Sequence, residues 1–350
     1  MEQDKKKRYL RYPLSFIPWR TCNAECAHCI TNSGPKVREH LSIDVIKRCL
    51  REAADIGIKG YQFSGGEPTL FLDKLLDLLE FGKALGMEAG ITTNASFARN
   101  PERAYQVMRK LADAGLTAVR ISTDKFHDPF IPFERVLMAI EAGLACKLET
   151  SVEVILVRKD TNLGEVFKAL QKYPAKILTG TLVPQGRAKS LPMDLFLTYS
   201  YHQIKQFCCP QASTVFVDSD GKTFFCCNYP RPAPGEPLDT SAYVIGNVYE
   251  DSLETILERL DTNPLSRVLA ERGPQGVIEW LESKFGEEKI SRLYRSQHRY
   301  YGLCDFCHTI LSHHQLIPLI REAVAEEAGA GIVGAGLAET AGVAQASFSV

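Results

Sequence analysis

Two patterns of apolar and polar positions alternate over the first half of the chain. Short runs that are apolar throughout, as strands covered on both faces are, take turns with longer stretches whose apolar positions recur at helical spacing. We expect strands at 14–19, 61–63, 87–93, 117–122, 151–157 and 176–183. We expect helices from Ser42 to near Gly57 and at 70–85, 101–114, 133–145 and 162–171.

This alternation predicts an α/β fold with a parallel sheet and right-handed crossovers. The polar loops that follow the strands would then gather at one edge of the sheet, where such folds build their sites. The alternation of strands and helices ends near residue 190. After it we expect a β-hairpin that turns at Asp220-Gly221. Helices are then expected at 251–260, 276–293 and 313–327. We expect four parts: a basic N-terminal arm (1–13), the α/β part (14–190), a smaller extension (191–327) and an Ala/Gly-rich tail (328–350).

Composition narrows the class of protein. The 350 residues are 45% hydrophobic and carry a net charge of −1, which disfavours binding to a nucleic-acid backbone. No apolar run approaches the roughly 20 residues that span a bilayer, and the first residues lack the apolar core of a secretory signal. We therefore expect a cytoplasmic protein with neither a nucleic-acid partner nor a membrane partner.

Eleven cysteines change the picture, because clustered cysteines in a reducing compartment favour metal or redox chemistry over disulfides. Cys22, Cys26 and Cys29 form a C-x3-C-x2-C loop directly after the first strand. Three thiolates can hold a 4Fe–4S cluster and leave one iron open for another ligand. The alternative is a zinc site, for which only His28 or His40 lies near enough in sequence to be a fourth ligand.

The cysteine loop has an aromatic residue, His28, directly before its last cysteine, and a Gly-Gly-Glu-Pro segment follows the second strand. Together they resemble the radical S-adenosylmethionine (radical SAM) superfamily. The resemblance implies a partial (β/α)6 TIM-type barrel, a 4Fe–4S cluster on Cys22, Cys26 and Cys29, and bound S-adenosylmethionine. It implies cofactor contacts from four consecutive residues: Gly65, Gly66, Glu67 and Pro68.

Weaker matches to the same family follow at later strand ends. They imply further cofactor contacts from five residues, namely Thr93, Asn94, Ser122, Asp124 and Arg158, and a Gly186-Arg187-Ala188 segment resembles one found after the family's sixth strand. The resemblance implies an enzyme that reductively cleaves S-adenosylmethionine to a 5′-deoxyadenosyl radical and abstracts a hydrogen atom from its substrate. It also implies an electron donor such as flavodoxin or ferredoxin.

A second set of cysteines lies in the extension. Cys208 or Cys209, then Cys226 four residues after Gly221, and finally Cys304 and Cys307 resemble the family's twitch or SPASM extension. That resemblance implies a second, auxiliary 4Fe–4S cluster with Cys208, Cys226, Cys304 and Cys307 as ligands. A zinc site built from the same thiols is the alternative.

Both hairpin positions are doubled, so one cysteine of each pair is surplus to a four-ligand cluster. If Cys226 is a ligand on a strand, Cys227 points to the other face and could donate a hydrogen atom to a substrate radical, as in some radical peptide epimerases. We expect peptide (RiPP) maturation such as Cα epimerisation. The alternatives are a dehydrogenase or epimerase of an aminocyclitol or carbohydrate, and a non-catalytic scaffold. The short stretch before the first strand suggests no leader-binding domain, which weakens the peptide reading.

Overall fold

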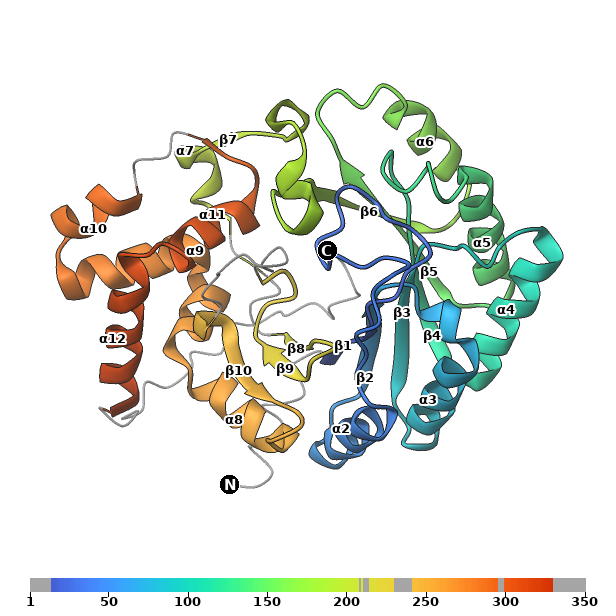
Figure 1. Cartoon of the computed structure of the whole chain (residues 1–350), viewed down its shortest axis with the longest axis horizontal. Coiled ribbons are helices and arrows are strands. Elements are labelled where there is room, and N and C mark those ends of the chain that lie inside the picture. Colours follow the sequence, from blue (N-terminus) through green and yellow to red (C-terminus); the bar gives the residue numbers. More distant parts are fainter. Residues whose placement is uncertain (1–13, 208, 210–213, 230–240, 295–298, 330–350) are drawn as a thin grey trace.

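A computed structural model describes residues 14–207, 209, 214–229, 241–294 and 299–329 of the chain. Six parallel strands follow one another in spatial order and form the curved sheet of a partial barrel (Figure 1). They are β1 (Leu14–Trp19), β2 (Gly60–Gly65), β3 (Glu88–Thr93), β4 (Leu116–Ser122), β5 (Glu149–Leu156) and β6 (Lys176–Thr181). The predicted α/β class and the partial (β/α)6 arrangement are confirmed.

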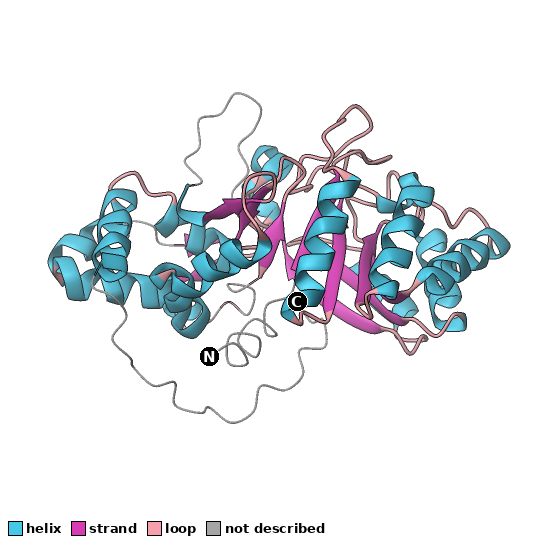
Figure 2. Ribbon diagram, turned by 90° about the horizontal axis from the view of Figure 1, so that it is seen from below, coloured by secondary structure: helices cyan, strands magenta, loops and turns pink. Residues whose placement is uncertain are grey.

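Helices cover the outer face of this sheet (Figures 1 and 2). The first shows why they form where the pattern predicts: Ser42 precedes the helix in an extended conformation, Gly57 ends it with a φ of 103°, and its inward side chains are spaced three or four residues apart. The helices are α2 (Ile43–Ile56), α3 (Leu72–Ala84), α4 (Pro101–Ala114), α5 (Phe133–Ala145) and α6 (Leu163–Leu170).

The helix predicted at 70–85 starts differently. Pro68–Phe71 forms a separate 3-10 turn, η1, before α3 begins at Leu72. The Glu67 side chain accepts a hydrogen bond from the Thr69 amide and so fixes this tighter turn. The Gly-Gly-Glu-Pro segment therefore passes directly from strand β2 into a rigid turn.

The extension continues the sheet of the barrel. The expected hairpin is present as β8 (Val215–Val217) and β9 (Lys222–Phe224), and β10 (Val244–Asn247) pairs antiparallel with β9. Strand β8 pairs in parallel with β1, so that Leu14 lies opposite Val215. Among the described residues one nine-stranded sheet results, in the order β10-β9-β8-β1-β2-β3-β4-β5-β6. A pattern of local sequence could not predict this pairing.

The helices of the extension depart most from prediction. Helix α9 consists of two helical segments that meet at Gly273, whose φ of 65° and ψ of −168° are not helical. The second segment begins close to the expected residue 276 but ends at Phe285, before a separate helix that starts at Glu287. The C-x2-C pair lies on an unpredicted helix, α11. The helices are α7 (Tyr201–Ile204), α8 (Leu253–Thr262), α9 (Pro264–Phe285), α10 (Glu287–Tyr294), α11 (Leu303–Leu311) and α12 (Leu316–Gly329).

Short elements complete the described chain: η2 (Gly186–Ser190), η3 (Met193–Leu195), η4 (Ser241–Tyr243), and the paired strands β7 (Tyr199–Ser200) and β11 (Arg299–Tyr300). None of the helices in the described ranges is long and apolar enough to cross a membrane. The expected N-terminal arm and C-terminal tail lie outside the described residues.

Candidate functional site

The first cysteine loop begins after strand β1 and folds back on itself. The Ala24 amide donates to Cys22 Sγ at 3.4 Å, and the Cys29 amide donates to the Cys26 carbonyl at 3.1 Å. The three thiols interact electrostatically, and burial raises the pKa of Cys22 to about 12. A buried thiolate needs a nearby cation, which an iron centre provides. The donor set therefore fits a cluster held by three cysteines.

The two histidines considered for a zinc site are engaged elsewhere. His28 Nε2 lies 3.1 Å from Asp124 Oδ2, and His40 is exposed, with its Nδ1 atom 3.1 Å from the Arg38 carbonyl of its own loop. Neither arrangement supplies a fourth ligand beside the three thiols, which favours the iron–sulfur interpretation.

The Gly-Gly-Glu-Pro segment packs directly on the cysteine loop. The amides of Gly66 and Glu67 donate to the carbonyls of Trp19 and Thr21 at 2.8 and 3.0 Å. A Cβ atom on Gly66 would lie 2.1 Å from the Thr21 carbonyl oxygen, so only glycine allows this approach. The segment therefore positions the loop that carries the cysteines.

Glu67 is a brace between two strand ends. Its fully buried carboxylate accepts hydrogen bonds from Thr69 Oγ1 at 2.6 Å, from Thr93 Oγ1 at 2.7 Å and from the Asn94 amide at 2.7 Å. Burial raises the pKa of Glu67, and these hydrogen bonds oppose the rise. The contact of Glu67 with a cofactor stays a prediction, because the hydrogen bonds of its carboxylate in this structure are all to residues of the protein.

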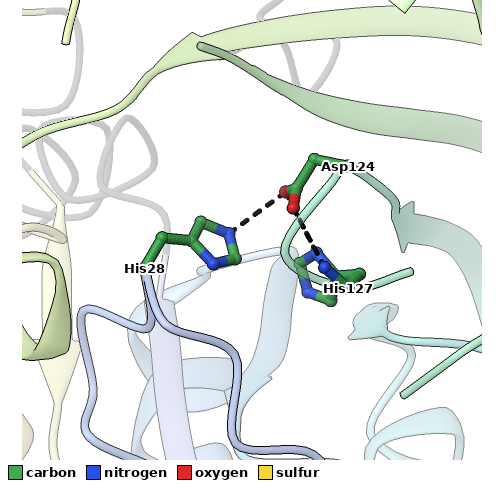
Figure 3. A group of neighbouring side chains, drawn as sticks. All are labelled: His28, Asp124 and His127. Atoms are coloured by element: carbon green, nitrogen blue, oxygen red, sulfur yellow. Dashed lines mark hydrogen bonds and ion pairs between the residues drawn. The ribbon is translucent and has the colours of Figure 1, made fainter. Parts of the chain in front are cut away.

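Asp124 braces the opposite side of the site (Figure 3). Its Oδ2 atom receives His28 Nε2 at 3.1 Å and His127 Nδ1 at 3.0 Å, and its Oδ1 atom accepts from the Phe126 amide at 2.8 Å. Burial alone would raise the pKa of Asp124, but the two imidazoles outweigh it and hold that pKa well below its usual range. Asp124 thus ties the loop after β4 to the cysteine loop.

Of the other residues predicted to contact the cofactor, Asn94 lies at the cysteine loop, whereas the roles of Ser122 and Arg158 are not tested. Asn94 Nδ2 reaches Cys22 Sγ at 3.6 Å and Asn23 Oδ1 at 3.1 Å, so this residue lies at the cysteine loop. Ser122 is half-buried at the end of β4. Arg158 is exposed and its backbone amide bonds to the Leu195 carbonyl. The roles of Ser122 and Arg158 toward a cofactor stay predictions.

A three-residue stretch after β6 contacts both cysteine regions. Arg187 donates from Nε to the Cys26 carbonyl at 3.0 Å and from its amide to the Cys29 carbonyl at 3.1 Å. Gln185 Nε2 lies 2.9 Å from His308 Nε2, one residue beyond Cys307. Gln185 and His127 are positioning residues that the sequence did not single out. For His127, the signal was its place three residues after Asp124.

The second group of thiols forms where helix α11 meets the end of the hairpin. Cys226, Cys304 and Cys307 are half-buried. Their partial removal from water raises the pKa of Cys304 to about 11 and raises the pKa values of Cys226 and Cys307 well above the ordinary value. Cys209 interacts electrostatically with all three. Cys304 and Cys307 share a helix face because they are three residues apart. Cys208, the predicted ligand, lies outside the described residues, and Cys209 occupies the fourth place in this group.

The expected position of Cys226 on a strand is wrong. Strand β9 ends at Phe224, so Cys226 and Cys227 lie in the turn that follows, where side chains need not alternate between faces. Cys227 is half-buried and interacts electrostatically with Cys226. Its nearness to the second thiol group thus comes from the turn.

Comparisons with known proteins agree with this geometry. The family profile of the Radical SAM superfamily matches residues 16–172, and that of the SPASM iron–sulfur cluster-binding domain matches residues 208–272. "Putative peptide biosynthesis protein YydG" of Bacillus subtilis is 22% identical over 85% of this chain and 91% of its own length. GTP 3′,8-cyclase of Pectobacterium atrosepticum is 30% identical, but the match spans only 46% of this chain and 50% of the cyclase.

Among solved structures, "Native anSMEcpe with bound AdoMet" superimposes with a TM-score of 0.53 over 89% of this chain and 99% of that one, at 14% identity. This likeness establishes the common fold. The first profile covers Cys22, Cys26 and Cys29, and the second covers Cys209 and Cys226 but ends before Cys304 and Cys307. The chain therefore carries a radical SAM domain over residues 16–172 and a SPASM iron–sulfur cluster-binding domain over residues 208–272.

Proposed function

We propose that this enzyme modifies a peptide by inverting the configuration of a residue at Cα. The observation that carries the proposal is the Cys226-Cys227 turn beside the second thiol group. Cys209, Cys226, Cys304 and Cys307 interact as four thiols, the number that a 4Fe–4S cluster takes, so Cys227 is surplus to that count. A surplus thiol next to a redox centre is suited to hydrogen-atom donation.

The cofactors of the family are 4Fe–4S clusters and S-adenosylmethionine. When bound, they supply a radical that removes a hydrogen atom from an unactivated C–H bond. Cys22, Cys26 and Cys29 would hold the first cluster, while Glu67 and Asp124 hold the surrounding loops in place. Asn94 and Arg187 fix the thiol and the carbonyls of the cysteine loop.

Cys227 would complete the inversion. Its S–H bond breaks as a new C–H bond forms on the opposite face of the substrate carbon, which leaves a sulfur-centred radical. One electron from the enzyme's electron donor and one proton from water restore the thiol. The similarity to YydG over most of both chains supports a peptide as the substrate, since that protein is named for peptide biosynthesis.

The test is a single turnover in heavy water with the reconstituted enzyme and a candidate precursor peptide. The expected product is the epimer carrying one deuterium at Cα, because a thiol exchanges its hydrogen with solvent. Cys227→Ala should still consume S-adenosylmethionine but should form no epimer. The matched control is Cys146→Ala, a half-buried cysteine at the end of α5 outside both thiol groups.

A different product would contradict the proposal. A product that has lost two hydrogen atoms, takes up no solvent deuterium and still forms with Cys227→Ala identifies a dehydrogenase. Mass spectrometry of the product separates the two outcomes.

A further inference from the structure

A hollow of about 690 Å³ opens beside the first cysteine loop. Asn23, which stands between Cys22 and Cys26 in the chain, forms one wall. Thr69 of the 3-10 turn η1 forms another, and the loop and first turns of α4 contribute Arg99 and Arg103. Arg135 of α5 also lines the hollow. Side chains from four segments that lie apart in sequence thus converge beside the cysteine loop.

The hollow is positively charged. Within the described ranges, Arg99, Arg103 and Arg135 form no ion pair with a carboxylate. Arg135 donates a hydrogen bond only to the Ser96 carbonyl, at 3.3 Å. By contrast Arg109, which lies on α4 like Arg103, is paired with Asp113 at 3.0 Å. Glu102 is the one acidic side chain among the lining residues. Uncompensated guanidinium groups around a hollow attract an anionic partner and speed its association.

Two side chains connect the hollow to a cluster ligand. Asn94 Nδ2 lies 3.1 Å from Asn23 Oδ1, on the wall of the hollow, and 3.6 Å from Cys22 Sγ. The Asn94 Oδ1 atom also accepts from the Ser96 amide at 3.0 Å, and Ser96 lines the hollow as well. A partner seated on the three arginines would therefore lie close to the first thiol group.

We propose that this hollow is the docking site of an acidic electron-transfer protein that carries a flavin or an iron–sulfur centre. The chemistry of the family consumes one electron at the first cluster in each cleavage. One electron passes from the reduced donor to the Cys22, Cys26 and Cys29 centre, so the donor is oxidised by one electron and no bond forms or breaks. Arg99 and Arg103 are exposed on the rim, which suits a broad acidic surface better than a small anion.

The experiment compares two reductants on the reconstituted enzyme. In stopped flow, reduction of the first cluster by a pre-reduced acidic flavodoxin is timed for the wild type and for the Arg99→Glu/Arg103→Glu variant, and then repeated with reduced methyl viologen. We expect the double variant to be slowed at least about tenfold with flavodoxin at low salt, and less so as ionic strength rises. With methyl viologen, a small cation, its rate should not fall.

Lys110→Glu is the matched control for Arg103→Glu, because it makes the same change of charge on the exposed face of the same helix without lining the hollow. Arg103→Gln should give an intermediate slowing if the effect is electrostatic. Equal slowing by Lys110→Glu would overturn the proposal, as would equal slowing with both reductants. Loss of precursor-peptide binding with an unchanged flavodoxin rate would also overturn it and would assign the hollow to the substrate.

Discussion

Arg20 and Asp218, 198 positions apart in sequence, form a two-point ion pair: Nη2 lies 2.6 Å from Oδ2, and Nε lies 3.2 Å from Oδ1. Arg20 follows strand β1 and leads into the cysteine loop, whereas Asp218 follows strand β8. Asp218 is only 1% exposed. Burial alone would lower the pKa of Arg20, but Asp218 outweighs it and raises that pKa. The pair joins the barrel to the extension at the base of the site.

Removing the arginine should therefore destabilise the protein strongly. Arg20→Met removes the arginine of this pair from the buried Asp218 carboxylate, for which we expect a loss of about 3–5 kcal/mol in the free energy of unfolding. Urea titration of the metal-free protein measures it. Arg109→Met breaks the exposed Arg109–Asp113 pair and should cost far less, because ion pairs on the surface contribute little to stability. Similar losses for the two variants would contradict the structural role of Arg20.

A single methyl group on Gly66 should weaken the first iron site. The Cβ atom of Gly66→Ala would overlap the Thr21 carbonyl oxygen, at 2.1 Å, and so displace the cysteine loop. We expect iron after reconstitution to fall towards about four atoms per chain, while the second site stays filled. Gly90→Ala is the control, because its Cβ meets its nearest neighbours at an ordinary 3.8 Å. Full iron content in Gly66→Ala would contradict this account.

The hydrogen bonds of Glu67 predict a large effect of a nearly isosteric change. Glu67→Gln would turn an amide group towards the donors of Thr69, Thr93 and Asn94 and leave at least one of them unpaired. The free energy of unfolding of the metal-free protein should fall by about 1–3 kcal/mol. Glu80→Gln, on the exposed face of α3, should change it by less than about 0.5 kcal/mol. If Glu67 instead only contacts a cofactor, the metal-free variant will be as stable as the wild type.

The contact between His127 and Asp124 predicts a pH-dependent stability. Burial alone would lower the pKa of His127, but Asp124 outweighs it and raises that pKa well above its ordinary value. The contribution of the pair is then complete at mildly acidic pH, below about 6.5, and falls by up to about 1.4 kcal/mol per pH unit as the pH rises from there to the folded-state pKa.

The measurement is the difference in unfolding free energy between metal-free wild type and His127→Gln from pH 5 to 9. His40→Gln, which removes an exposed histidine, is the control. A flat difference for His127→Gln would show that the imidazole is not held protonated by Asp124.

Iron counts distinguish the cysteines of the second group. The wild type should hold about eight iron atoms, and the Cys22/Cys26/Cys29 triple alanine variant about four. Cys209→Ala should disturb the second cluster, because Cys209 interacts with Cys226, Cys304 and Cys307, whereas Cys227→Ala should leave iron nearly unchanged. About four iron atoms in the wild type, with zinc making up the rest, would refute the second cluster.

The barrel was predictable because each of its elements carries a local signal. Strand β1, helix α4 and helix α5 have the predicted bounds, since apolar runs, Pro101 at a first turn and regular apolar spacing are readable without tertiary context. Helix α9 was predicted only in its second part, because Gly273, with a φ of 65°, interrupts the helical backbone and Pro274 begins a second helical segment.

The sequence predicted where the residues of the site lie better than it predicted what their side chains do. The sequence placed Glu67 and Asp124 at strand ends beside the cysteine loop, but their hydrogen-bond donors come from other loops. A carboxylate that faces a ligand and one that braces a loop look alike until those donors are located. The pairing of β8 with β1 could not be predicted from local sequence patterns either, because it joins Leu14 to the distant Val215.

That pairing has a consequence for how the protein is made on the ribosome. Strand β1 is synthesised before strand β8, so one of its edges acquires its partner only when residues 215–217 have been made. At translation rates of about 5–20 residues per second, the delay is on the order of 10–40 s. An open apolar strand edge is a template for aggregation during that interval. We therefore expect the nascent chain to need shielding by chaperones, and slower translation to lower the yield of folded enzyme.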